Sequence, residues 1–287
     1  GAEVLRVQVA LDPDPARPIV GPAVFLAFHV RVEQAGAAAV KGEGAGGHLP
    51  ELLPEGVAGS VSTVPVSFKA FRIDERAQRK ARENLWRCVD HLEQLTRRTG
   101  HSFHLGLEPE PLCFLENTYE AVEFFGQMRA ERPGDLRIQE HLGINYDCCH
   151  LAIEYESPQE ALSRLRRAGI RISKIHLSNA LSVHPTPAAR EALKAFADDI
   201  YFHQTIERRA DGEIVRYSDL DEALATSLSD GPQLDREWRI HFHIPLHAPP
   251  TGLFETTTDH LLGALEWLRA NPRLCSHLEM ETYTWEV

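Results

Sequence analysis

From about residue 50 onward, strand-like runs alternate with amphipathic segments, and this alternation restricts the possible folds more than any other feature of the chain. Such a pattern is typical of βα units, in which parallel strands form one sheet and helices cover it. The predicted strands are residues 59–65, 102–108, 142–147, 172–177, 238–246 and 277–283.

Helix signals separate several of these strands. Apolar residues recur at helical spacing in residues 76–97, and Asp74 stands where an N-cap is expected. Ser157-Pro158-Gln159-Glu160 has the pattern of a capping box with proline at the first helical position. Residues 117–129, 187–197 and 257–269 are also predicted helices, and Ala210-Asp211-Gly212 predicts a hairpin turn within residues 207–217.

The length of 287 residues suits one α/β barrel, which typically needs roughly 250 residues. Residues 50–287 are therefore predicted to form an α/β-barrel domain, and residues 1–49 an irregular N-terminal segment. This segment contains two strand-like runs, 4–10 and 23–32, without a crossover helix, so they are not ordinary parallel βα units. The segment could pack irregularly, the proper opening units could be missing, or the reading frame could be misassigned.

Composition narrows the function classes. The formal net charge is −12, and an acidic surface disfavours binding to nucleic acid. No run of about 18 apolar residues predicts membrane insertion, and no signal peptide is recognisable. The five cysteines lack paired spacing, so we expect reduced thiols and a cytoplasmic protein.

Metal-binding side chains stand at or near the ends of the predicted strands. In α/β barrels these ends converge on one face, where the active site forms. Imidazoles and carboxylates from separate strands could hold a divalent ion there, with Zn²⁺ or Mn²⁺ expected. The candidate residues are Glu108, Glu110, Asp147, His150, His176, His241, His243, Glu279 and Glu281. Each alone is weak evidence, but their occurrence strand after strand favours a metal site.

Some of these motifs resemble a known superfamily. Leu107-Glu108, Asp147-Cys148-Cys149-His150, Ile175-His176-Leu177-Ser178-Asn179 and Glu281 are similar to the xylose isomerase-like barrels, which include sugar-phosphate isomerases, epimerases and endonuclease IV-type enzymes. Longer strings resemble most closely the bacterial metabolite traffic protein EboE family, over about residues 50–287. These strings lie at 52–56, 59–65, 105–111, 145–150, 241–246 and 281–285.

The resemblance implies a xylose isomerase-like, TIM-type (β/α)8 barrel that binds one or more divalent metals. It implies that Glu108, Asp147, His176 and Glu281 are ligands. His150 and His243 would be further ligands or acid/base groups, and Glu281 would join them in catalysis. His241 and Glu110 would orient ligands. Ser178-Asn179 replaces an Asp that often follows the strand histidine in the isomerases, and residues 1–49 do not resemble the family's opening strands.

Three functions remain open from the sequence. The favoured one is a metal-dependent isomerase or epimerase acting on a small metabolite. The alternatives are a non-catalytic protein that binds and hands over a metabolite, and a metal-dependent phosphoester hydrolase of the endonuclease IV type. The EboE resemblance also implies a membrane prenyltransferase-like partner. Lys174 could neutralise a substrate oxyanion or form a structural ion pair, and the sequence leaves the oligomeric state open.

Overall fold

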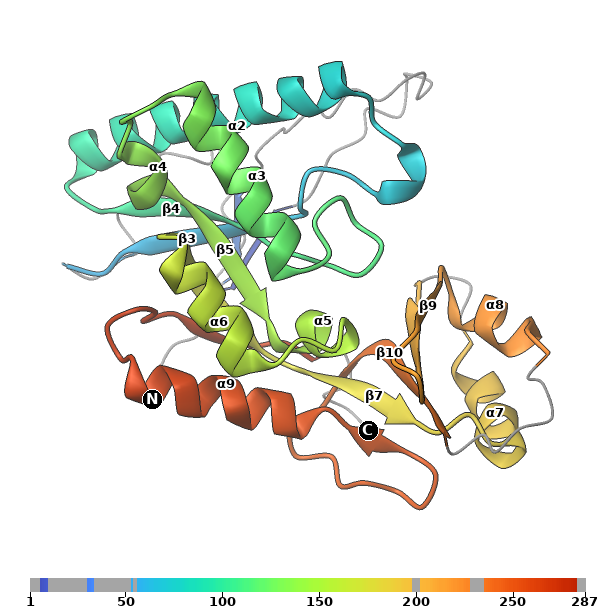
Figure 1. The fold of residues 1–287 in the computed structure, drawn as a ribbon. Coiled ribbons are helices and arrows are strands. Elements are labelled where there is room, and N and C mark those ends of the chain that lie inside the picture. The colour runs from blue at the N-terminus through green and yellow to red at the C-terminus, as the bar shows by residue number, and fades with distance from the viewer. Residues whose placement is uncertain are drawn as a thin grey trace.

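A computed structural model of the chain describes residues 6–9, 30–33, 53, 56–197, 202–227 and 235–282. Two five-stranded sheets dominate these residues (Figure 1). The parallel sheet has the order β12-β6-β5-β4-β3 and consists of β3 (Gly59–Thr63), β4 (Phe103–Leu107), β5 (Leu142–Asp147), β6 (Arg171–Leu177) and β12 (Leu278–Met280). The antiparallel sheet has the order β11-β7-β10-β8-β9 and consists of β7 (Asn179–Val183), β8 (Thr205–Arg209), β9 (Ile214–Tyr217), β10 (Arg236–Ile244) and β11 (Glu255–Thr256).

The predicted closed (β/α)8 barrel is wrong. The parallel strands form an open half-barrel of five, and the run predicted at 238–246 is β10 of the antiparallel sheet. The chain leaves the parallel sheet after β6, because β7 starts at Asn179, only two residues after Leu177. A parallel connection needs about a dozen residues or more, so β7 cannot return beside β6 as another parallel strand. It pairs antiparallel with β10 and β11 instead.

Helices α2 (Glu75–Thr99), α3 (Thr118–Glu131) and α4 (Arg137–His141) follow strands β3 and β4 in the chain (Figure 1). The predicted N-cap of α2 is confirmed, because the Asp74 carboxylate accepts a hydrogen bond from the Ala77 amide at 2.7 Å. The left-handed Gly100, with φ of 75°, ends this helix. These local signals therefore set both ends of α2.

Helices α6 (Pro158–Arg167) and α9 (Thr258–Ala270) pack against each other (Figure 1). The predicted start of α6 is correct, with proline in the first turn, but the Ser157 side chain forms no cap hydrogen bond. Its hydroxyl donates to the Gln159 side chain at 3.4 Å instead. The capping-box prediction therefore identified the helix start, while the proposed serine cap is wrong.

The parallel strands have one apolar face and one polar face. Leu105 and Leu107 of β4, with Ile144 and Tyr146 of β5, belong to the core cluster that includes helical residues. Because side chains alternate along a strand, neighbouring positions such as Asn145 face away from that core. Parallel strands are usually apolar on both faces, so this buried polar face is the place to look for a functional site.

The antiparallel sheet has a separate small core. It packs against α7 (Pro187–Leu193) and α8 (Leu220–Ala225), and it includes Trp238. The Trp238 indole donates to the buried Glu207 carboxylate at 2.8 Å. The predicted hairpin is confirmed by the antiparallel pair β8–β9, with Gly212 at φ 86° in its turn. β10 lies at the centre of this sheet, between β7 and β8, and also contacts α5 (Cys148–Ile153).

Two strands from the N-terminal segment are described, β1 (Arg6–Val9) and β2 (Val30–Glu33), and they pair antiparallel in a sheet of their own. This agrees with the prediction that these runs are not parallel βα units. The rest of the prediction for residues 1–49 lies outside the described residues.

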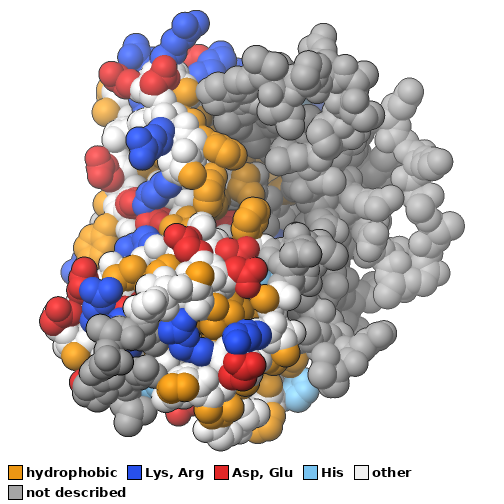
Figure 2. All heavy atoms as spheres, turned by 90° about the vertical axis from the view of Figure 1, so that its right-hand side faces the viewer, with side chains coloured by type: hydrophobic (Ala, Val, Ile, Leu, Met, Phe, Trp, Pro, Cys, Tyr) orange, Lys and Arg blue, Asp and Glu red, His pale blue; other side chains and the backbone are white. Residues whose placement is uncertain are grey.

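None of the helices in the described part of the chain is both long and apolar enough to cross a membrane. On the face shown in Figure 2, Lys and Arg side chains are interspersed with Asp and Glu. The described residues on that face therefore form no broad basic patch of the kind that binds nucleic acid.

Candidate metal centre

Strand register brings the predicted ligands together at one edge of the parallel sheet. Asp147, the last residue of β5, is in register with His176 of β6, and His176 is in register with Glu279 of β12. Glu108 directly follows β4, and Glu281 directly follows β12. Because the carboxyl ends of neighbouring parallel strands lie side by side, these distant residues of the sequence become neighbours.

Four of these residues form what we call the carboxylate cluster: Glu108, Asp147, His176 and Glu281. One donor atom from each lies within 4.8 Å of the others, so the group could hold a metal ion. His176 is central, because its Nδ1 lies 3.1 Å from Glu108 Oε1 and 3.2 Å from Asp147 Oδ2. The same Nδ1 contacts Glu281 Oε2. Three carboxylates and one imidazole are a donor set that suits a divalent cation.

Charges of opposite sign meet at His176. Burial favours the neutral form of its imidazole, but the surrounding carboxylates outweigh burial and raise the pKa of His176. Burial also opposes ionisation of Asp147, yet the nearby His150 and His176 hold the pKa of its carboxyl well below the usual range. The pKa of Glu108 is lowered in the same way by His176. A proton on the imidazole thus provides the positive charge that a metal ion would otherwise supply.

A second group, which we call the histidine cluster, consists of His150, His241 and His243. His241 Nε2 lies 3.0 Å from His150 Nε2 and 3.0 Å from His243 Nε2. His241 and His243 come from β10, whereas His150 comes from α5 (Cys148–Ile153), which directly follows β5. The antiparallel sheet and the end of the parallel sheet therefore meet at these three rings.

Hydrogen bonds fix which ring nitrogens of this cluster carry protons. His150 Nδ1–H donates to the Pro109 carbonyl at 3.1 Å, and His241 Nδ1–H donates to Gln204 Oε1 at 2.7 Å. The Gln204 amide is oriented in turn by its N–H bond to Glu110 Oε1 at 3.3 Å. If both rings are neutral, the Nε2 lone pairs of His150 and His241 face each other at 3.0 Å. This is unfavourable unless a cation lies between the two nitrogens. A proton or a metal ion would satisfy this arrangement.

The pKa shifts of these histidines differ in sign. Burial, with the charge of His150 beside it, holds the pKa of His241 well below its usual value. Burial also lowers the pKa of His243. For His150 the charges of Asp147 and Glu108 outweigh burial and raise the pKa. The cluster therefore combines neutral imidazoles, which can accept a proton or bind a metal, with one imidazole that tends to keep its proton.

Asp147 joins the two clusters. Donor atoms of Asp147, His150 and His243 lie within 4.8 Å of one another, and Asp147 also belongs to the carboxylate cluster. Its Oδ1 accepts hydrogen bonds from the Ser178 hydroxyl at 2.8 Å and from the His150 amide at 3.0 Å. The six predicted ligands thus form two joined groups and not one ring of ligands. Ser178, which lies where the sequence differs from the isomerase pattern, orients the shared Asp147 carboxylate through its hydroxyl.

Cys149 also lies near the histidine cluster, and its Sγ is within 4.8 Å of donor atoms of His241 and His243. Its thiol, however, donates to the Phe242 carbonyl at 3.5 Å and packs in an apolar cluster with Ile153 and Ile206. Burial and the charge of Asp147 raise its pKa well above the usual value. A thiol must lose its proton to bind a metal, so Cys149 is the least suitable donor of the group.

Some functional residues were assigned other roles from the sequence or were missed. His241 was predicted to orient ligands, but its Nε2 lies at the middle of the histidine cluster. Glu110 accepts a hydrogen bond from Gln204, which in turn contacts the His241 ring. No sequence signal identified Gln204, which lies in a short segment before β8.

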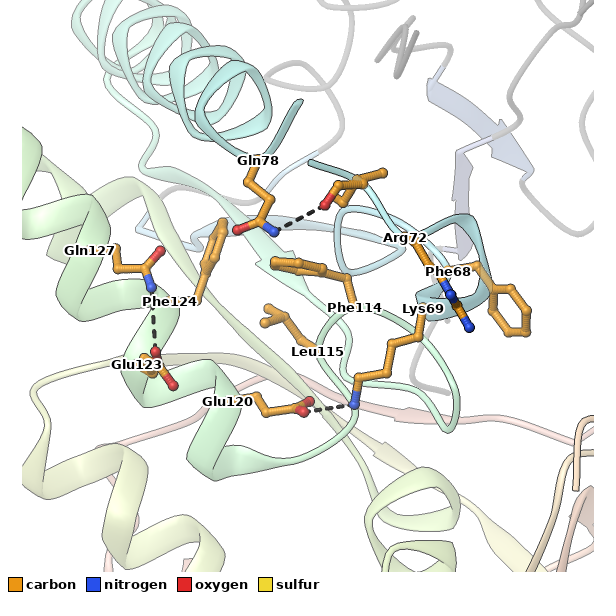
Figure 3. Close-up of a pocket in the computed structure, with 11 residues that line it drawn as sticks. Phe68, Lys69, Arg72, Gln78, Phe114, Leu115, Glu120, Glu123, Phe124 and Gln127 are labelled. Atoms are coloured by element: carbon orange, nitrogen blue, oxygen red, sulfur yellow. Dashed lines mark hydrogen bonds and ion pairs between the residues drawn. The ribbon is translucent and has the colours of Figure 1, made fainter. Parts of the chain in front are cut away.

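A cavity of about 370 Å³ lies elsewhere, between η1 (Lys69–Phe71), α2 and α3 (Figure 3). It is lined by Phe114, Phe124 and other side chains, and none of the residues of the two clusters lines it. Lys69, at its rim, is already paired with Glu116 and with Glu120 at 2.7 Å. This cavity is therefore separate from the metal centre.

No family model, curated protein or solved structure matches the chain. The donor atoms and their geometry are therefore what identifies this candidate metal centre.

Proposed function

We propose that the protein is a divalent-metal-dependent enzyme of the isomerase or epimerase type, acting on a small hydroxylated or carbonyl-bearing metabolite. The observation that carries this proposal is the junction at Asp147 between a carboxylate cluster suited to a cation and a histidine cluster suited to proton transfer. Isomerisation and epimerisation of such molecules need both functions at one place.

Glu108, Asp147, His176 and Glu281 would hold the ion, and Zn²⁺ or Mn²⁺ fits their mixed nitrogen and oxygen donors. A bound divalent ion would polarise a substrate oxygen and lower the pKa of a water molecule. Glu281 is the most exposed of the three carboxylates, with a side chain 28% accessible, so it is the member best placed to meet a substrate.

The histidine cluster would move the proton. His243, whose pKa is lowered by burial, is neutral near pH 7 and can accept a proton. His150, whose pKa is raised by Asp147 and Glu108 against the effect of burial, can donate one. The 3.0 Å contacts of both rings with His241 allow a proton to pass between them. We therefore assign the acid/base role to His150 and His243.

The test combines metal analysis with a substrate panel. Purified wild-type protein should contain bound Zn²⁺ or Mn²⁺, or take it up stoichiometrically, and should interconvert at least one polyol, keto sugar or phosphorylated sugar. A Glu108→Ala/Asp147→Ala variant should lose the metal and the turnover. Glu266→Gln, on an exposed part of α9, is the matched control and should keep both. Turnover that is indifferent to chelation would overturn the proposal.

The shared Asp147 also favours a second candidate, a hydrolase acting on small phosphoesters. Two-metal phosphatases hold their ions roughly 3.5–4 Å apart, and a carboxylate common to both clusters could lie between two such ions. Release of phosphate from the phosphorylated members of the panel would identify this activity. The EboE resemblance supports a third outcome, metabolite binding and handover to a membrane prenyltransferase-like partner, which would give tight binding without turnover.

A further inference from the structure

Behind His176, on the side away from the carboxylate cluster, lies a buried ion pair. Lys174 of β6 has a side chain only 2% exposed, and its Nζ donates to Glu279 Oε2 at 2.9 Å. The same Glu279 oxygen lies 3.6 Å from His176 Nε2. From the sequence, Lys174 could contact a substrate or form a structural ion pair. In the structure it forms an ion pair with Glu279.

The two nitrogens of His176 face different groups. Nδ1 faces Glu108, Asp147 and Glu281, whereas Nε2 lies 3.2 Å from the Asn145 side-chain nitrogen and 3.6 Å from Glu279 Oε2. When a histidine binds a metal through one nitrogen, the other commonly donates its N–H to a carboxylate, which fixes the tautomer and the orientation of the ring. Glu279 is a carboxylate on the Nε2 side of the ring, slightly beyond hydrogen-bond distance, so a small shift of the ring on metal binding would bring the two into contact. Strand register holds it there, because Glu279 is the direct β12 neighbour of His176.

Lys174 explains how a fourth carboxylate can be tolerated in this place. An unpaired charge on Glu279 beside three other acidic groups would be repelled, and the ammonium group of Lys174 compensates it. A buried ion pair often adds little stability over apolar side chains of similar volume. A pair that contributes little to stability but lies against a metal ligand is better explained by the orientation of that ligand.

We propose that Glu279 and Lys174 form a positioning pair, in which Glu279 accepts the Nε2–H of His176 and so directs Nδ1 toward the metal, while Lys174 holds the Glu279 carboxylate in place. This inference rests on the proposed function, because it concerns the same metal centre. Neither residue contacts the reacting atoms, and both act through His176.

The test uses the full chain loaded with Co²⁺, a paramagnetic substitute for the native ion. In wild type, the exchangeable Nε2–H of His176 should give a hyperfine-shifted proton signal that is protected from solvent exchange. Glu279→Gln keeps the size of the side chain but removes its charge. We expect its Co²⁺ affinity to fall by about 10- to 100-fold, the usual effect of losing such a partner, and the N–H signal to exchange rapidly.

Two further variants separate positioning from stability. Glu279→Gln/Lys174→Met removes both charges, so it should fold even if Glu279→Gln alone does not, and it should show the same loss of affinity and of protection. Glu266→Gln, exposed on α9, should behave as wild type.

The outcomes distinguish the two proposals. Failure of the wild type to bind Co²⁺ would overturn the proposed function and this inference with it. Binding by the wild type, with unchanged affinity and a still protected N–H in the folded double variant, would overturn only the positioning role.

Discussion

The parallel and the antiparallel sheet bring different donors to the same centre. The parallel sheet supplies carboxylates and a single imidazole, from the ends of β4, β5, β6 and β12. The antiparallel sheet supplies the imidazoles of His241 and His243 from β10. Asp147 and His150, at the junction of β5 and α5, connect the two sets.

Because the two clusters differ in charge, the pKa of histidine is shifted in opposite directions in them. His176, surrounded by carboxylates that outweigh the effect of burial, has a raised pKa, whereas His241, buried beside other imidazoles, has a strongly lowered pKa. The same side chain therefore holds a proton in one cluster and is neutral in the other. If the clusters are two functional parts of one centre, substitutions in each should have separable effects.

The largest effect is expected from Asp147→Asn, because Asp147 belongs to both clusters. The amide keeps the size of the side chain and can still accept from the Ser178 hydroxyl, but it lacks the charge that compensates a divalent ion. We expect metal content to fall below detection after dialysis, measured by plasma emission spectrometry. Full metal retention in this variant would show that the two clusters do not share a ligand.

The next effect separates the clusters. Glu108→Gln removes a ligand of the carboxylate cluster only, and His243→Ala removes one from the histidine cluster only. If each cluster binds an ion, each variant should lose one of two equivalents, with affinity for that ion reduced by roughly 10- to 100-fold or more. If only the carboxylate cluster binds metal, His243→Ala should keep the metal and lose turnover. Equal metal loss in both variants would contradict the separation.

The sequence predicted that Glu108, Asp147 and Glu281 lie close together, and they do, because their positions follow from local patterns. Each lies at or near the end of a predicted strand, and the carboxyl ends of parallel strands lie together in any α/β sheet. The helix starts at Asp74 and Pro158 were readable for the same reason, since caps and prolines act locally.

The antiparallel sheet could not be predicted in this way. The run containing His241 and His243 has the same alternation as a parallel strand, and nothing in its composition shows the direction of its neighbours. The decisive feature, the two-residue step from Leu177 to Asn179, passes through Ser178 alone and has neither the glycine nor the proline that commonly marks a turn. Contacts such as Gln204 with His241 depend on this tertiary arrangement, so they had no sequence signal.

The pH dependence of metal binding sharpens the comparison further. Because the pKa of His176 is raised by its carboxylate neighbours against the effect of burial, an incoming ion must displace a proton from this ring. In a His243→Ala background, affinity should rise with pH by up to about tenfold per unit between pH 6 and 8. Adding His176→Gln removes that proton, so binding should be weaker and nearly independent of pH. Isothermal titration in buffers of different ionisation enthalpy counts the protons released, and an unchanged count in the double variant would contradict this assignment.

The smallest expected effect is on stability and does not involve the metal. It concerns the contact between α5 and the antiparallel sheet. Glu154, at the end of α5, pairs with Arg216 of β9 at 2.5 Å, yet burial outweighs this partner and raises its pKa to about 7. A carboxyl whose folded pKa exceeds its unfolded value favours the protonated form in the fold. Stability should therefore fall as the pH rises from about 4.5 to about 7.

Glu154→Gln keeps a hydrogen-bonding side chain without this titration. At pH 8 the variant should be more stable than wild type by about 1 to 3 kcal/mol, because the raised pKa already includes the attraction to Arg216 and so corresponds to a net cost of at most about 3 kcal/mol for the buried charge. At pH 5 the two proteins should be nearly equal. Urea unfolding at both pH values measures the difference, and Glu213→Gln, in the exposed β8–β9 turn, is the control. A variant that is less stable than wild type at pH 8 would show that the ion pair with Arg216 outweighs the cost of burying Glu154, so that charge pairing, and not apolar packing alone, joins the antiparallel sheet to α5.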